Sequence, residues 1–194
     1  SQLVLSPDGG PFRPSRAFQA EKASLTCTVD GGRMLMLPFT ADVPEGVKAY
    51  AVDDDMKAVE LTSIPAHQPV LVLADGDITF EGRGEVSYAV SALSSVLRGV
   101  YVPITIYKGS YQLGTLNGEW GFTRRQTDAQ LAPFDVYAVP KSTERFVSIN
   151  FDDTGVESIV TTQDDAPVFN VMGQRVDDTY RGMIIVRGKK YIKR

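Results

Sequence analysis

The stretch that decides the fold reads YQLGTLNGEWGFT at positions 111–123. The pair Asn117-Gly118 separates two runs of strand-forming residues, Tyr111–Leu116 and 119–123. Both Asn and Gly tolerate the positive φ angles that the tightest hairpin turns require. The sequence therefore predicts a two-residue β-hairpin whose strands run antiparallel.

The flanking sequence keeps the two-residue period of β-strands. Apolar residues alternate in segments 33–39, 100–106 and 147–151. Segment 69–73 is instead continuously apolar, as a strand covered on both faces would be. Between such runs, turns are expected at Asp30-Gly31-Gly32, Glu45-Gly46, Asp75-Gly76 and Lys108-Gly109.

The composition is that of an ordinary globular protein. Of 194 residues, 43% are hydrophobic and 23% charged, which excludes wholesale disorder, a collagen-like chain and a disulfide scaffold. The net charge of −4 argues against general nucleic-acid binding. No apolar run reaches the roughly 18 residues of a membrane span. Because no basic-then-apolar leader opens the chain, either the protein is intracellular or the chain begins after a removed export signal.

We expect four segments along the chain. Residues 1–17 form an extended lead-in, in which residues 3–5 could add an edge strand. An all-β module follows over 18–151, then a polar, acidic linker over 152–167, then a short β tail module over 168–194. Within the module, segment 90–97 alone has helical spacing and predicts a short helix or turn.

The end of the chain carries a distinctive motif. Residues 168–176 read VFNVMGQRV, and residues 181–193 read RGMIIVRGKKYIK. This resembles the short C-terminal motif of many secreted and surface proteins of Bacteroidetes, which is similar to the sorting domains of type IX secretion. Met183 replaces the usual aromatic residue, and Arg187 the usual Asn or Asp. The motif positions are Gly173, Gln174, Arg175, Gly182, Gly188, Lys189 and Lys190.

The body of the chain resembles a module that often precedes that tail. The similar stretches are 37–50, 64–72 and 134–151, so the resemblance covers roughly residues 20–194. It implies an exported, all-β, non-catalytic C-terminal region, located on the surface or in the cell envelope. Such regions occur in large multi-domain surface proteins, including adhesins and glycan-active enzymes, so further domains of a larger parent protein are expected.

Two single residues could carry chemistry. His67 lies between Pro65 and Pro69, and related modules commonly carry Asn there, which suggests a turn role. No Gly-x-Ser-x-Gly elbow supplies a nucleophile for a histidine base. Cys27 alternates with Leu25 and Val29, which predicts a small buried hydrophobe rather than a reactive thiolate.

The acidic clusters could suggest a metal site or a hydrolase. They are Asp53-Asp54-Asp55, Asp152-Asp153, Asp164-Asp165 and Asp177-Asp178. None matches a calcium-binding EF-hand loop, and no pairing of carboxylates for glycoside hydrolysis can be assigned. We therefore expect solvated loop acids, no metal and no cofactor.

An aromatic set is the main functional candidate. Alternation places Tyr101 and Tyr107 on the face opposite Val100, and Trp120 follows the Asn-Gly turn. Exposed aromatics on a sheet can stack on sugar rings. The alternative is a second hydrophobic layer or a domain interface. The candidate stacking residues are Trp120, Tyr101, Tyr107 and Tyr111.

The sequence thus predicts an antiparallel β-sandwich or partly open barrel followed by a small β-hairpin module. The expected function is adhesion or scaffolding in a secreted or surface protein, with an export- or attachment-type tail. A carbohydrate-binding accessory module is the first alternative, and a glycan-active enzyme domain is the second. The partners would be glycans or another surface protein.

Overall fold

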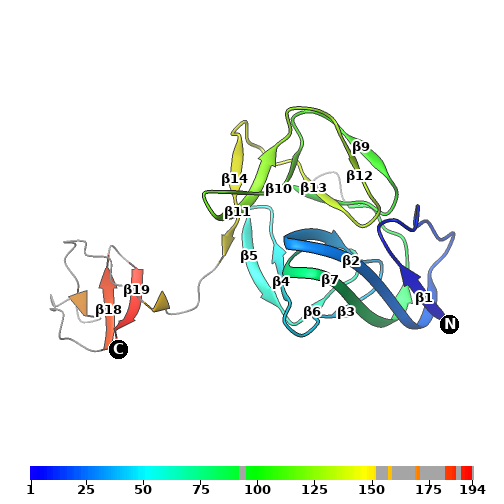
Figure 1. The fold of residues 1–194 in the computed structure, drawn as a ribbon, viewed down its shortest axis with the longest axis horizontal. Helices are drawn as coiled ribbons and strands as arrows, with labels where there is room; N and C mark the ends of the chain where they lie inside the picture. The colour runs from blue at the N-terminus through cyan, green and yellow to red at the C-terminus, as the bar shows by residue number, and fades with distance from the viewer. Residues whose placement is uncertain (92–94, 152–156, 159–168, 171–181, 187–188, 194) are drawn as a thin grey trace. The chain divides into compact units, whose positions relative to one another are not determined.

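The protein is an all-β chain that divides into two compact units, Ser1–Phe151 and Asp152–Arg194. The structure is a computed structural model, and it describes residues 1–91, 95–151, 157–158, 169–170, 182–186 and 189–193 (Figure 1). Over these residues the chain forms strands and turns and no helix. The described sheets are mainly antiparallel and stay open, which confirms the predicted sandwich-type all-β class.

The larger sheet of the first unit is built around two long strands. Its order is β1-β2-β7-β4-β5-β15; β3 also pairs with β7, and β6 pairs with β3. β1 pairs in parallel with β2, so the expected edge strand near residues 3–5 is present. The strands are β1 (Gln2–Leu5), β2 (Phe18–Met36), β3 (Ala41–Asp42), β4 (Lys48–Val52), β5 (Lys57–Leu61), β6 (Ser63–Ile64), β7 (Pro69–Val86) and β15 (Asn150–Phe151).

β2 and β7 form a long ribbon that curves through the unit (Figure 1). Their pairing runs from Phe18 opposite Val86 to Met36 opposite Pro69. Gly31 (φ 72°) and Gly76 (φ 97°) take left-handed backbone near the middle of the two strands. The turns predicted at these glycines are wrong, because both residues lie inside paired strands. Glycine here permits a local bend without ending the strand.

The second sheet contains the predicted hairpin. Leu116 is paired with Glu119, and Asn117 (φ 52°) and Gly118 (φ 81°) form the two-residue turn between them. The sheet order is β14-β11-β10-β13-β8, and β9 pairs separately with β12. The strands are β8 (Leu97–Gly99), β9 (Ile104–Ile106), β10 (Tyr111–Leu116), β11 (Glu119–Arg124), β12 (Ala129–Leu131), β13 (Val136–Ala138) and β14 (Phe146–Ser148).

Two other turn predictions are confirmed. At Glu45-Gly46 the Val47 N–H donates to the Pro44 carbonyl oxygen at 3.1 Å. At Lys108-Gly109 the Ser110 N–H donates to the Tyr107 carbonyl oxygen at 3.0 Å. The predicted helix or turn at 90–97 lies partly outside the described residues, and its described last residue, Leu97, begins β8.

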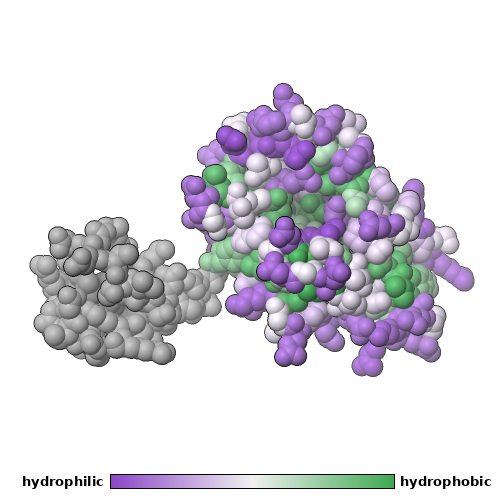
Figure 2. All heavy atoms as spheres, in the orientation of Figure 1, coloured by the Kyte–Doolittle hydropathy of each residue, from purple (hydrophilic) through white to green (hydrophobic). Residues whose placement is uncertain are grey.

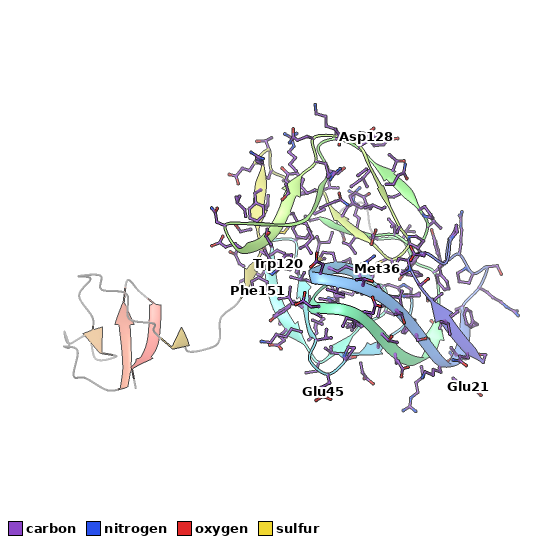
Figure 3. All side chains as sticks on the ribbon, viewed as in Figure 1. Glu21, Met36, Glu45, Trp120, Asp128 and Phe151 are labelled. Atoms are coloured by element: carbon purple, nitrogen blue, oxygen red, sulfur yellow. The ribbon has the colours of Figure 1, made fainter. Side chains whose placement is uncertain are left out.

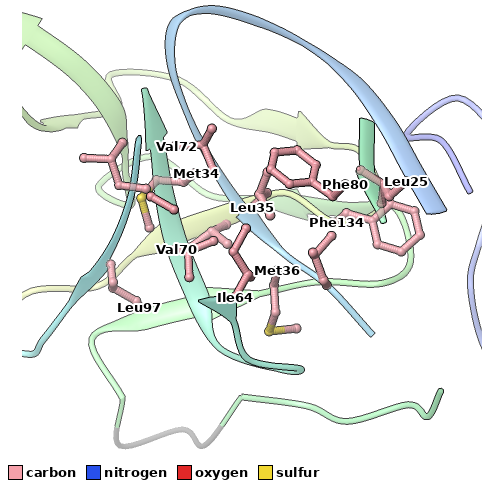
Figure 4. Close-up of a cluster of buried hydrophobic side chains, with 14 of the residues drawn as sticks. Leu25, Met34, Leu35, Met36, Ile64, Val70, Val72, Phe80, Leu97 and Phe134 are labelled. Carbon is pink, nitrogen blue, oxygen red and sulfur yellow. The ribbon is translucent and has the colours of Figure 1, made fainter. Parts of the chain in front are cut away.

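The end of the ribbon joins the two sheets. Leu35 forms a β-bridge with Asp135, and the Met36 N–H donates to the Phe134 carbonyl oxygen at 2.9 Å. Around this junction the side chains of β2, β7 and residue 134 share one hydrophobic core (Figure 4). Val70, Leu71 and Val72 are completely buried, which confirms that this strand is covered on both faces.

The lead-in also belongs to the core. Phe12 is buried, and its N–H donates to the Tyr101 carbonyl oxygen at 2.7 Å. The Phe12 ring lies edge-on to the Tyr101 ring, with 5.9 Å between the centroids. Residues 1–17 are therefore packed against the module rather than merely leading into it.

The smaller unit is a short sheet. It contains β16 (Glu157–Ser158), β17 (Phe169–Asn170), β18 (Gly182–Val186) and β19 (Lys189–Lys193), in the order β16-β19-β18-β17. β18 and β19 pair antiparallel, with Val186 opposite Lys189, as expected for a C-terminal hairpin. Gly182, Lys189 and Lys190 of the tail motif lie in these strands. Gly173, Gln174, Arg175 and Gly188, with most of the expected linker, lie outside the described residues.

Candidate functional site

Trp120 packs against the fold rather than standing free on the sheet surface. Its side chain is half-buried and lies against the bend of the β2–β7 ribbon (Figure 3). A methyl group added at Gly32 would lie 2.6 Å from Cη2 of the indole, and one at Gly31 would lie 3.5 Å from Cζ2. The two glycines therefore leave the space that the indole ring occupies, and Trp120 joins the second sheet to the ribbon.

Substitution of Gly32 by Ala is expected to destabilise the protein by about 1–3 kcal/mol, because the new methyl group overlaps the indole ring. In the Trp120→Ala background the same change should cost much less, since the obstacle is gone. Urea unfolding of the wild type, both single variants and the double variant measures this coupling. Strictly additive losses would contradict the contact.

Tyr101 is buried, contrary to the face that its alternation predicts. The residues around it, 100–103, form no strand, so the two-residue period is lost before Pro103. Its ring contacts Phe12, Tyr88 and Phe134. Burial of the hydroxyl raises the pKa of Tyr101, since ionisation in this apolar surrounding is costly. Tyr101 is a core residue and not a stacking residue.

His67 forms a polar network with Tyr101 and Ser87. Its Nδ1 lies 2.6 Å from the Tyr101 hydroxyl, and its Nε2 lies 2.8 Å from Ser87 Oγ. The Tyr101 hydroxyl donates to the Leu37 carbonyl oxygen at 2.8 Å. That bond leaves Nδ1 as the donor to Tyr101 and Nε2 as the acceptor from Ser87. The His67 N–H also donates to Leu37, and its backbone is left-handed (φ 62°), which agrees with the predicted turn role.

The stability of the protein should depend on the protonation of His67. Burial lowers the pKa of His67 from its ordinary value, because the charged ring is poorly solvated there. The unfolded chain then binds a proton more readily than the folded protein. The stabilising contribution of neutral His67 is therefore complete above about pH 6.5. Below that pH the free energy of unfolding decreases as the pH falls towards the lowered pKa of the folded state.

We expect the variant His67→Asn to lose this pH dependence between about pH 7.5 and pH 5.5. Asn tolerates the left-handed backbone and carries no titrating group. His67 is the one histidine in the chain, so the difference between variant and wild type isolates it. Urea unfolding at a series of pH values is the measurement. Equal slopes for the two proteins would contradict the prediction.

The other two candidate tyrosines, Tyr111 and Tyr107, lie in different surroundings. Tyr111 is buried, and its hydroxyl donates to the carbonyl oxygens of Ser142 and Glu144, so it holds a loop and is not a stacking residue. Tyr107 is 71% exposed, beside the Lys108-Gly109 turn. The four predicted stacking residues therefore do not form one platform, because two lie in the core and Trp120 lies on the ribbon.

Cys27 and the described acids have structural surroundings. Cys27 is buried in β2, as predicted, and desolvation raises the pKa of its thiol. Asp53 Oδ1 accepts the N–H groups of Asp55 and Lys57. Asp54 Oδ1 accepts the Val96 N–H. The other three acidic pairs lie outside the described residues. In the part of the chain that is described, no group of three potential ligands is placed to hold a metal ion.

A groove of about 700 Å³ lies where the bend of the β2–β7 ribbon faces the second sheet. Figure 2 shows hydrophilic and hydrophobic residues mixed on one face of the first unit. The walls of the groove come from four separate parts of the chain: 28–34, 112–113, 123–127 and 131–136. Its volume is typical of ligand-binding sites.

Arginine dominates the charge of the groove. Arg33 Nη2 lies 2.8 Å from Asp135 Oδ1, and Asp135 Oδ2 accepts the Ala132 N–H at 2.9 Å. Arg124 and Arg125 also line the groove, and Arg125 Nε is buried without a hydrogen-bond partner among the described residues. A buried donor left unpaired costs free energy, so this nitrogen destabilises the ligand-free protein.

Sequence reasoning did not identify this groove. Its arginines lie in segments that pair only in the folded chain, and Arg124-Arg125 carries no motif. The sequence feature that could have indicated the groove is the adjacent pair Arg124-Arg125 at the end of a hairpin strand in an acidic chain.

Comparisons with protein-family models, with curated proteins and with solved structures find no match. No helix in the described residues has both the length and the apolar character that crossing a bilayer requires.

Proposed function

We propose that the first unit is a non-catalytic binding module of a secreted or cell-surface protein, with an adhesion or scaffold role. The observation that carries this proposal is the groove. It joins a ligand-sized volume to two arginines that make no ion pair within the described part of the chain, on a scaffold of paired strands. Arg124 ends β11, and the backbone of Arg125 is hydrogen-bonded to Ser110 and Gly109. A backbone fixed in this way holds the two side chains in place, which lowers the entropic cost of binding.

The positions of the reactive side chains support binding over catalysis. Both ring nitrogens of His67 are bonded within the fold, and Cys27 is buried. Two carboxylates, Asp30 and Asp135, line the groove. Both oxygens of Asp135 are occupied by Arg33 and the Ala132 N–H, so this residue is poorly placed to transfer a proton.

A glycan array probed with the full chain tests the binding function, and backbone amide shifts locate any ligand. Binding that shifts residues of the groove walls is the expected result. Hydrolysis of a bound polysaccharide would overturn the non-catalytic assignment. The absence of binding to glycans and to surface-protein extracts would overturn the binding function.

We further propose that the second unit serves export or attachment. The proposal is supported by the resemblance of its motif and by the hairpin formed by β18 and β19. Deletion of residues 152–194, followed by localisation, tests it, with an unrelated tail of equal length as the control. Normal export of the truncated protein would overturn this role.

A further inference from the structure

We infer that the groove binds a carboxylate-bearing glycan and that Arg124 and Arg125 hold the carboxylate. This inference rests on the proposed binding function and adds the class of ligand. The planar guanidinium group matches a carboxylate with two parallel hydrogen bonds. Arg33 is already engaged by Asp135. Within the described residues the side chains of Arg124 and Arg125 have no acidic partner, so their donors are available to a ligand.

The charge balance favours a singly charged group. The groove is lined by three arginines and by the carboxylates Asp30 and Asp135. A doubly charged phosphate or a densely sulfated chain would meet both carboxylates at close range, which is unfavourable. A single carboxylate on an otherwise neutral molecule can bind Arg124 and Arg125 with less repulsion.

The neutral lining favours a sugar over an acidic peptide. Hydroxyl and amide groups, which pair well with sugar hydroxyls, are supplied by Gln112, Thr123 and Thr127. Thr28 and Gln126 also line the groove, but the Thr28 hydroxyl donates to Asp77 and the Gln126 amide donates to the Arg124 carbonyl oxygen, so these two side chains offer mainly acceptor oxygens. Asp30 can accept a hydrogen bond from a sugar hydroxyl, whereas it would repel the successive charges of an acidic peptide. The described lining contains no aromatic residue, so recognition depends on charge and hydrogen bonds rather than on ring stacking.

Arg125 provides a readout that separates a binding role from a structural one. Its Nε is buried without a partner among the described residues, so the ligand-free protein carries a desolvation cost at this position. The variant Arg125→Met keeps most of the side-chain volume and removes the unpaired donor. We expect its melting temperature to equal or exceed that of the wild type, while the affinity for the ligand falls about tenfold or more. A structural arginine would instead lower the melting temperature when replaced.

Calorimetric titration of the full chain with neutral oligosaccharides that carry one galacturonate, glucuronate or mannuronate residue tests the ligand class. Their methyl esters serve as matched ligands without the charge. At least one acid form is expected to bind, and its ester about tenfold more weakly or worse. Arg124→Gln and Arg125→Gln should each lower the affinity about tenfold, as the loss of a charge-assisted hydrogen bond would. Arg145→Gln is the control, since Arg145 is exposed and lies outside the groove lining.

Four outcomes of the titrations would overturn the inference. They are equal binding of acid and ester, binding of none of the three acids, affinity unchanged in the Arg124 and Arg125 variants, and preference for a poly-glutamate peptide or a sulfated glycan. A neutral glycan bound in the groove would overturn the inference and leave the binding function standing. If no glycan on the array bound, both the inference and the proposed binding function would be contradicted.

Discussion

Replacement of Gly82 by Ala is expected to lower the free energy of unfolding by about 3 kcal/mol, because an added methyl group makes its closest contact here among the described glycines. A Cβ at this position would lie 2.0 Å from the Thr40 carbonyl oxygen and 2.9 Å from Phe39 Cδ2. The first obstacle is backbone, and Ala41 next to it is paired with both Gly82 and Ile64. Phe39 is fully buried, so neither group can move aside cheaply.

Urea unfolding measures the loss, and Gly46→Ala is the comparison variant without a steric overlap. Unlike Gly82, Gly46 has a left-handed backbone (φ 77°), and nothing lies within 4 Å of its Cβ position. That control isolates the conformational cost of an alanine, about 1–2 kcal/mol. A Gly82 variant no less stable than the Gly46 variant would show that β3 and β7 can separate without penalty.

Tyr101→Ala is expected to cost about 3–5 kcal/mol, as for other large aromatic side chains removed from a core. The Tyr101 ring contacts Phe12 of the lead-in, Tyr88 just after β7, and Phe134. Its loss therefore leaves a cavity between three segments of the chain. Tyr101→Phe keeps the ring and removes only the hydroxyl. It should cost about 1–3 kcal/mol, because His67 Nδ1 loses its partner.

Thermal or urea unfolding of the two Tyr101 variants separates the packing contribution from the hydrogen bonds. Tyr107→Ala is the control, since that ring is 71% exposed and should change stability by no more than about 0.5 kcal/mol. If Tyr101→Phe were as damaging as Tyr101→Ala, the polar network rather than the ring would be the source of stability at this position.

The features that could be predicted from the sequence are those set by neighbouring residues. The Asn117-Gly118 hairpin forms because both turn residues adopt left-handed backbone locally. The buried strand at 69–73 follows from its continuous apolar run. The glycines at 31 and 76 were harder to interpret, because a glycine permits a bend as well as a turn. Only pairing across the ribbon, from residues distant in the chain, shows that the strands continue.

The candidate site could not be predicted for the same reason. Its arginines and carboxylates are brought together by contacts between β2, the end of β11 and residue 135. Tyr101, Tyr111 and Trp120 pack within the fold instead, and Tyr107 is exposed away from them. In a β protein, the same alternating sequence pattern is found for an aromatic residue that packs in the core and for one that stacks on a ligand. The role of the residue therefore depends on the layer of the folded protein in which it lies.

The ribbon of β2 and β7 also sets the order in which the chain can fold. Met36 and Pro69 are its partners closest in sequence, and Phe18 and Val86 are the most distant. Loop closure is least costly at the Met36–Pro69 end, so we expect pairing to start there, to pass the glycine bend next and to end at Phe18 and Val86. Until β7 has been synthesised, the 19-residue β2 has no antiparallel partner. Nascent chains that stop before residue 69 should therefore be the species most prone to aggregate.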